Sequence, residues 1–387
     1  MATLCCELPE ILEEIFSWLP TQSLMRFKCV SKSWNAFIKS LLKNPEFVNK
    51  HLRNIDKKVL SRTTCLVFFC PGSVKWQHPR RGAPRRDLLK VLTVSHDHNE
   101  SDRINYDGQV LRLPTLFPSE LPLAHLFRSH CNGIICLANC YDTVILCNPS
   151  INECRTLPEP YLTDGVVGVG FGYDLRPNDY KVVRFGLDNL VVRAEVYSMG
   201  ADSWREIEIQ CQFDYPSHVD KEVFCKGFFY WFIETEEHII ISFDMFHEVF
   251  DSIPLPNNVL RTWDDHFIKL AVWNESVALL SCHRETGFTN SIEVWVMDDC
   301  HGSVTSSCFW IKKLVIGPLV GIVTPSTFWK NDELLMETAN ERSISYNLHS
   351  QKLRHLTVIE VANTYPQWDF LYMKSLVSVQ GQENSGS

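Results

Sequence analysis

The sequence has no long hydrophobic run. Its apolar stretches, such as Leu66–Cys70, are far shorter than the roughly 18 residues that a membrane-spanning helix needs. The N-terminus also lacks a basic segment followed by an apolar one, the pattern of a secretory signal. We therefore expect no membrane span, and a protein of the cytoplasm or the nucleus.

The fifteen cysteines include no Cys-x-x-Cys pair, a spacing typical of zinc sites. Five of them gather beside His130: Cys131, Cys136, Cys140, Cys147 and Cys154. Alternation along β-strands would direct these side chains to both faces of a sheet. We interpret them as buried free thiols, with zinc as the alternative. The polar runs His96–His98 and Asp264–His266 are only weak indications of a metal site. We therefore predict no metal and no cofactor.

Catalytic motifs are also missing. No Gly-x-Ser-x-Gly elbow occurs. The run Gly168–Gly172 is similar to a phosphate-binding loop, but it lacks the third glycine at the dinucleotide spacing and a helix after it, so we interpret it as a hairpin turn. We predict no catalytic residue. A β-ring enzyme with its catalytic residues on the ring axis is the less favoured alternative.

Acidic residues outnumber basic ones, 46 to 37, and the formal net charge is −9. This balance argues against nonspecific nucleic-acid binding. Residues 195–299 carry 20 acidic and 6 basic residues. This tract is either a set of solvated loops and strand edges or a surface that steers a basic partner. The candidates for such target binding are Glu234, Glu236, Glu237, Asp264 and Asp265.

Residues 1–55 have the pattern of a helical module. Apolar residues recur at three- and four-residue steps after Pro9, a residue that suits the first turn of a helix. Pro20 ends this first helix, and Thr21 is expected to cap a second one over about residues 22–30.

Ser31 or Ser33 is expected to start a third helix, and Pro45 breaks the pattern before a last turn or two. Three short helices carry more apolar surface than they can bury among themselves. An unburied apolar surface of this kind indicates a protein partner.

From about residue 60, short apolar runs alternate with Gly, Pro, Asn and Asp turns. Pairs of runs recur every 46 to 53 residues, and their central residues are Leu146, Val196, Ser242, Trp295 and Tyr346. Two hairpins per ~50 residues predict a four-stranded blade of a kelch-like β-propeller. The alternative, a β-sandwich, explains the strands but not the period.

Five copies fill residues 129–356, and residues 62–128 hold strand-like runs for another, divergent blade. The run Phe370–Val379 is expected to close the ring against it, since pairing the two ends removes an exposed edge. We therefore predict an N-terminal all-α module (1–55), an all-β propeller of six four-stranded blades (56–380), and a disordered tail (381–387).

Residues 5–50 closely resemble an F-box. The resemblance rests on Leu8-Pro9, on Leu19-Pro20 and on the run from Leu24 to Trp34. F-boxes bind the Skp-type adaptor of cullin-RING ubiquitin ligases, so the resemblance implies that partner. It assigns the adaptor contacts to Leu8, Pro9, Ile11, Ile15, Leu19, Pro20, Leu24, Lys28, Val30 and Trp34. Leu24 and Trp34 have the alternative role of holding the helices together, and the whole block has the alternative of a bundle packed on the rest of the chain.

The β-region resembles the F-box-associated, kelch-like domain of plants. The sequence motifs that carry this resemblance include Cys147–Ser150, Gly170–Asp174, Asp179–Arg184 and Phe328–Leu335. With these motifs, the whole chain resembles S-locus F-box proteins. The resemblance implies a non-catalytic substrate receptor of a Skp–cullin–F-box (SCF) ubiquitin ligase. The implied target is a basic S-ribonuclease in pollen self-incompatibility. The alternatives are a different target, or a scaffold that does not promote degradation.

Overall fold

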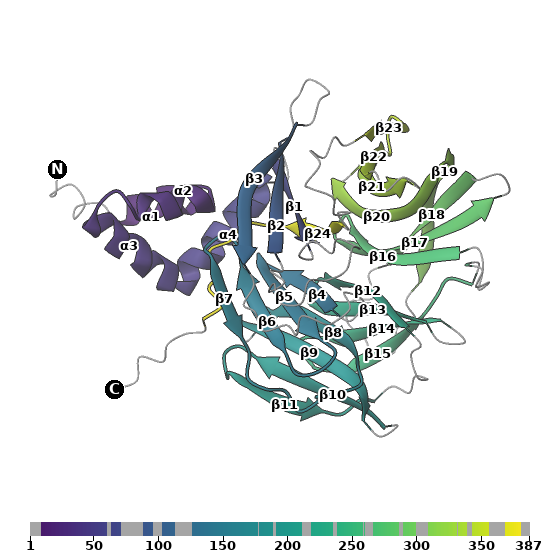
Figure 1. The fold of residues 1–387 in the computed structure, drawn as a ribbon, viewed down its shortest axis with the longest axis horizontal. Helices are drawn as coiled ribbons and strands as arrows, with labels where there is room; N and C mark the ends of the chain where they lie inside the picture. Colours follow the sequence, from purple (N-terminus) through teal and green to yellow (C-terminus); the bar gives the residue numbers. More distant parts are fainter. Residues whose placement is uncertain are drawn as a thin grey trace, which may run out of the picture.

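A computed structural model shows helices that project from one side of a ring of β-sheets (Figure 1). The residues that it describes are 9–59, 63–70, 88–95, 103–112, 126–176, 178–188, 191–210, 218–234, 238–257, 259, 266–285, 289–298, 309–330, 332–338, 343–355 and 368–380. The predicted disordered tail, 381–387, lies outside them.

Four helices precede the first strand: α1 (Pro9–Ser17), α2 (Thr21–Phe27), α3 (Lys32–Lys43) and α4 (Pro45–Val59). The prediction of three helices and a last turn or two was wrong, because α4 is a full helix of 15 residues. Phe47, Val48, His51 and Ile55 recur at helical spacing and are all buried, so tertiary packing stabilises the whole segment. The predicted module boundary at residue 55 falls inside α4.

Local chemistry sets the helix ends. Pro9 opens α1 as predicted. Ser31 caps α3, its hydroxyl accepting a hydrogen bond from the Trp34 amide at 3.1 Å. The prediction that Thr21 caps α2 was wrong, since Thr21 is the first helical residue and Pro20 holds the cap position. The Thr21 hydroxyl instead donates to the Lys374 carbonyl at 3.2 Å.

The described strands form four-stranded antiparallel sheets, five of them from consecutive strands. The first two sheets comprise β4 (Leu126–Cys131), β5 (Ile134–Asn139), β6 (Val144–Asn148) and β7 (Glu153–Thr156), then β8 (Val166–Asp174), β9 (Asp179–Asp188), β10 (Val191–Ser198) and β11 (Ser203–Ile207). The next two comprise β12 (His218–Cys225), β13 (Phe228–Glu234), β14 (Ile239–Asp244) and β15 (Phe250–Pro254), then β16 (His266–Trp273), β17 (Ser276–Glu285), β18 (Thr289–Met297) and β19 (Trp310–Val320). The fifth comprises β20 (Ile322–Lys330), β21 (Glu333–Thr338), β22 (Ser343–Asn347) and β23 (Lys352–His355).

A further four-stranded sheet joins the two ends of the β-region. Its order is β24 (Trp368–Tyr372), β1 (Thr63–Cys70), β2 (Leu88–Ser95) and β3 (Arg103–Arg112). The predicted pairing of the C-terminal run with the divergent first strands is confirmed, because β24 pairs with β1. The strand β3 was not predicted.

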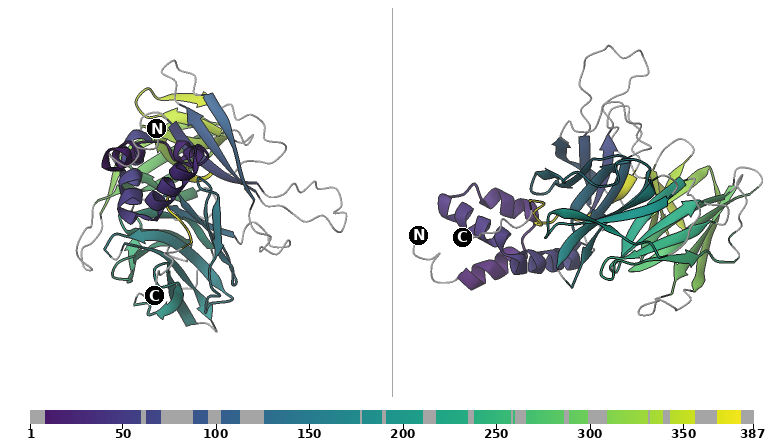
Figure 2. Two further views of the ribbon diagram at one scale, coloured as in Figure 1. Left: turned by 90° about the vertical axis from the view of Figure 1, so that its left-hand side faces the viewer. Right: turned by 90° about the horizontal axis from the view of Figure 1, so that it is seen from below.

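The sheets are arranged as a β-propeller (Figure 2). Their innermost strands β4, β8, β12, β16 and β20 contact one another in chain order, and β24 contacts both β20 and β4. Five blades therefore consist of consecutive strands. The predicted number of six blades is reached only when the closing sheet of β24 and β1–β3 is counted as a blade. Joining the ends in this way gives β1 a partner on both sides and closes the ring.

The repeat seen in the sequence corresponds to one strand of each sheet. Leu146, Val196, Ser242, Trp295 and Tyr346 lie in β6, β10, β14, β18 and β22. Each of these is the third strand of its sheet, and all five residues are buried. Because the five residues occupy equivalent buried positions, their spacing repeats with the period of the sheets.

The interpretation of Gly168–Gly172 as a hairpin turn was wrong, because the run lies inside β8. A Cβ atom at Gly170 would come within 2.8 Å of the Phe229 and Trp231 rings, and one at Gly168 within 2.2 Å of the Phe185 ring. The glycines therefore allow aromatic rings to approach the strand backbone closely.

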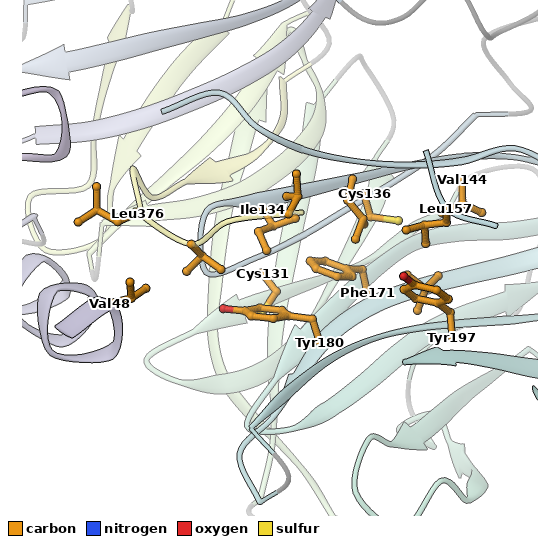
Figure 3. Packing of buried hydrophobic residues seen from close by; sticks show 14 of the residues in the cluster. Val48, Cys131, Ile134, Cys136, Val144, Leu157, Phe171, Tyr180, Tyr197 and Leu376 are labelled. Carbon is orange, nitrogen blue, oxygen red and sulfur yellow. The ribbon is translucent and has the colours of Figure 1, made fainter. Parts of the chain in front are cut away.

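The helices and the propeller share one hydrophobic core. The cluster runs from Phe16, Leu24 and Val48 in the helices to Ile134 and Phe171 in the sheets. Figure 3 shows this continuity, with Val48 of α4 beside Leu376 and the row of sheet residues beyond it. The helical unit, residues 9–59, is thus fixed on the propeller by apolar packing.

Candidate protein-binding surfaces

Aromatic side chains fill the interior of the helical unit. The Phe16 ring lies 5.3 Å from that of Trp34 and 5.7 Å from that of Phe37, measured between centroids, and Phe27 meets Trp34 edge-on at 5.4 Å. Such tilted pairs are favourable beyond the burial of their area. The helices are therefore held together without help from the outer side of α1.

The outer side of α1 is exposed and apolar. Ile11 and Ile15 are 52% and 50% exposed, and Val30, after α2, is 63% exposed. Trp18 is also exposed, with its indole nitrogen donating to Glu14 at 2.9 Å. Trp18 was absent from the predicted contacts, although its spacing from Ile11 and Ile15 places it on the same helical face. These four residues, which we call the outer face, are available to a partner.

The other predicted adaptor contacts are placed differently. Leu24 is only 1% exposed, so its side chain packs between the helices and is not available for contact with an adaptor. Trp34 is half-buried in the aromatic interior, and Leu19 and Lys28 are also half-buried. Pro20 is exposed. Leu8 and the side chain of Pro9 lie outside the described residues.

His51 of α4 connects the helices from inside. Its Nε2 donates to the Leu19 carbonyl at 2.9 Å, and no hydrogen-bond partner is described for its Nδ1. Burial lowers the pKa of His51 to about 4, and the hydrogen bond with Leu19 opposes this shift. His51 is therefore neutral at physiological pH and braces the α1–α2 turn.

The C-terminal strap, residues 373–380, passes between the helices and the propeller (Figure 1). Its Lys374 carbonyl accepts from Thr21, and its Val377 carbonyl accepts from Asn148 Nδ2 at 2.8 Å. Gly133, in the β4–β5 turn, faces this strap, and a Cβ atom there would lie 2.4 Å from the Met373 carbonyl. The strap therefore helps to fix the orientation of the helical unit on the ring.

The two ends of the propeller differ. Because the strands alternate in direction, the turns between first and second strands lie at one end of the ring, and those between second and third strands lie at the other. Asn49 of α4 donates to Asn178 in the β8–β9 turn at 3.4 Å, so the helices occupy the first end. The β13–β14 connection, which starts after Glu234, belongs to the opposite end. A target at that end would not collide with the helical unit.

Of the acidic candidates, only Glu234 is among the described residues, and it is half-buried. Glu236, Glu237, Asp264 and Asp265 lie outside them. The steering surface therefore stays a prediction.

Within the described ranges, no three His, Cys, Asp or Glu side chains are grouped to hold a metal ion.

A cavity of about 410 Å³ lies by the β16–β17 turn, lined by Trp273, Met297 and Lys313 among others. No helix in the described part of the chain combines the length and the apolar character needed to cross a membrane.

Comparison with known proteins matches both parts of the chain. The family model described as the F-box associated beta propeller domain matches residues 84–379, and the F-box domain model matches residues 5–45. The first range covers the sheets from β2 onward, and the second covers α1 to α3.

Relatives from Arabidopsis thaliana agree. One F-box protein is 28% identical over 76% of this chain and 60% of its own length, and another is 24% identical over 96% of both. Jacalin-related lectin 38 is 28% identical over 75% of this chain and 50% of its own length. The chain thus spans about 60% of the first relative and nearly all of the second. With its helical unit and its ring of sheets, the chain belongs to the F-box proteins that carry an F-box-associated β-propeller domain.

Proposed function

We propose that the protein is the substrate receptor of an SCF-type ubiquitin ligase. The observation that carries this proposal is the outer face, where Ile11, Ile15 and Val30 are at least half exposed although the interior beneath them is already filled. Exposed aliphatic and aromatic side chains, such as Ile11, Ile15 and Trp18 along one side of α1, are typical of protein-binding surfaces. The outer face would bind a Skp-type adaptor, and through it the cullin.

The proposed mechanism is proximity. The shared core and the strap hold the helical unit in one orientation on the propeller. A target bound to the ring would therefore stay at a fixed distance from the conjugating enzyme, which raises the effective concentration of its lysines. The chain needs no catalytic residue for this role, and the proposed site of action is the cytoplasm or the nucleus.

For the target, we propose a basic protein at the end of the propeller opposite the helices. The support is the acidic tract and the position of Glu234 at that end. Reversing the charges of Glu234, Glu236 and Glu237 should then slow association at low salt. An unchanged association rate would remove electrostatic steering from the proposal. The finer hypothesis of a pistil S-ribonuclease rests on the sequence phrases alone.

The experiment is a purification of the full chain from its native tissue, followed by reconstitution. The proposal expects the adaptor and a cullin to co-purify, and the captured target to gain ubiquitin when the ligase is supplied with its activating and conjugating enzymes. Recovery of a ribonuclease would support the finer hypothesis. A complex with the adaptor that never modifies its captured target would favour the scaffold alternative, and absence of the adaptor would contradict both.

A further inference from the structure

Two cysteines face each other across the outer hairpin of one blade. Cys147 of β6 and Cys154 of β7 are direct partners in the antiparallel register. Their sulfur atoms lie 2.8 Å apart. Cys147 is fully buried, whereas Cys154 is partly exposed on the outermost strand of its sheet.

The pair occupies the type of position in which strands come closest. The Leu157 amide donates to the Val144 carbonyl at 2.9 Å, so these two residues form a hydrogen-bonded pair. Such pairs alternate with non-hydrogen-bonded ones along a ladder, which makes Cys147 and Cys154, three positions away, a non-hydrogen-bonded pair. Cα atoms in these pairs are about 4.5 Å apart, within the roughly 4.4–6.8 Å that a disulfide spans.

From this geometry we propose that Cys147 and Cys154 form a reversible disulfide when the protein meets a peroxide. The Cys154 thiolate attacks one oxygen of hydrogen peroxide, the O–O bond breaks, and a sulfenic acid and hydroxide form. The Cys147 sulfur then attacks the Cys154 sulfur and loses its proton, and the sulfenic oxygen leaves as water. In sum, two thiols give up two hydrogens, and one peroxide becomes two water molecules. A dithiol reductant reverses the change.

The environment assigns the two roles. Cys154 is the more accessible of the two sulfurs, and its hydrogen bond with the Cys147 sulfur lowers its pKa, which favours the thiolate there. That same hydrogen bond, together with burial, raises the pKa of Cys147, so Cys147 waits as the protonated resolving thiol.

The bond would form beside the C-terminal strap. The carboxylate of Glu153, next to Cys154, accepts from Ser378 Oγ at 2.7 Å and from the Val379 amide at 3.1 Å. The Gln380 side chain donates to the Cys154 carbonyl at 3.3 Å. Linking β7 to β6 therefore stiffens the strand on which the strap rests, and oxidation tightens the connection between ring and helices.

The test uses the full chain, reduced and then treated with hydrogen peroxide before alkylation of the remaining thiols. Trypsin leaves both cysteines in one peptide, because no Lys or Arg lies between them, whereas cleavage after Glu153 separates them. We expect the two fragments to stay joined after peroxide and to separate after dithiothreitol. Hydrogen exchange at the Val379 amide should slow in the oxidised form and recover on reduction.

Matched variants sharpen the result. With Cys154→Ser, Cys147 should remain reduced at the same peroxide dose, whereas Cys282→Ser, a buried cysteine of another blade, should form the link as the wild type does. The wild-type peptide map alone can overturn the proposal. It does so if Cys154 carries a stable sulfenic or sulfinic acid while Cys147 stays free, if Cys154 joins another cysteine, or if it stays unmodified when the exposed Cys29 is oxidised. Unchanged exchange at Val379 in the linked form would overturn the effect on the strap.

Discussion

The propeller and the helical unit differ in how completely they bury their apolar side chains. Every residue of β5 and β6 is buried, so these strands are covered on both faces. By contrast, α1 buries Phe16 on one side and leaves Ile11 and Ile15 half exposed on the other. These two strands are therefore packed on both sides, whereas α1 is packed only on the side that carries Phe16. This difference indicates where a partner protein binds.

The largest expected effect comes from replacing one side chain on each side of the helical unit with alanine. Phe47→Ala removes a ring that is 1% exposed and should lower the free energy of unfolding by about 3–5 kcal/mol. Ile15→Ala, on the outer face, should change it by no more than about 0.5 kcal/mol. Equilibrium urea unfolding measures both. Equal losses would mean that the outer face already has a partner within the chain.

The second prediction compares a buried ion pair of the propeller with an exposed one. Arg184 and Glu195 are both 0% exposed and lie 3.1 Å apart without a well-aligned hydrogen bond, while Glu195 also accepts from the Tyr161 amide at 2.8 Å. Glu195→Ala leaves Arg184 buried without this partner and should cost about 3–5 kcal/mol. Glu206→Ala removes a partner of the exposed Arg193 and should leave stability nearly unchanged. Thermal unfolding of the two variants measures both losses. Similar melting temperatures would contradict the predicted difference between the buried and the exposed ion pair.

A pH titration tests the inner side of the helical unit. The pKa of His51 is about 4 in the folded chain, below its ordinary value of 6.5, so protons favour the unfolded state. Its contribution to stability is present above pH 6.5 and is lost as the pH falls toward 4. Between pH 7 and pH 5 this loss is about 2 kcal/mol.

The variant His51→Gln, which can still donate to the Leu19 carbonyl, should remove this part of the pH dependence. The matched control is His349→Gln, on an exposed turn. If wild type and His51→Gln lose stability in parallel between pH 7 and pH 5, His51 is not buried in its neutral form.

The smallest expected effect concerns the start of α3. Ser31→Ala removes the hydroxyl that accepts from the Trp34 amide and should cost about 1 kcal/mol. Ser33→Ala, at the second residue of the helix, removes only the contact between the Ser33 and Ser31 hydroxyls at 3.1 Å and leaves the bond to the Trp34 amide in place, so it should cost less. Urea unfolding that ranks the two variants in the reverse order would show that the cap does not hold α3.

The sequence predicted the elements whose pattern repeats. The period of Leu146, Val196 and Trp295 located a hairpin in each blade, because these residues occupy equivalent buried positions. The full length of α4 was missed, since Ile55 continues its buried face beyond a run of polar residues. The strand assignment of Gly168–Gly172 was missed because it depends on Phe185 and Trp231, which are distant in the sequence.

The candidate surface was predicted only in part. Ile11, Ile15 and Val30 are exposed in the structure, but helical spacing alone cannot tell an outer from an inner apolar residue when both sides of a helix are apolar. The F-box resemblance assigned Leu24 to the adaptor, with holding the helices together as its alternative role, and it did not include Trp18. The separation became visible only once Phe16, Trp34 and Phe37 were seen to fill the interior.

The most direct test is a calorimetric titration of a Skp-type adaptor into the full chain. The account predicts a one-to-one complex that Ile15→Asp weakens by about 100-fold or more, which corresponds to a loss of about 2.7 kcal/mol. Val191→Asp, which alters an exposed residue of β10, should bind as the wild type does. Adaptor binding that survives Ile15→Asp unchanged, or a wild-type chain that binds no adaptor, would contradict the central claim that the outer face is the docking site.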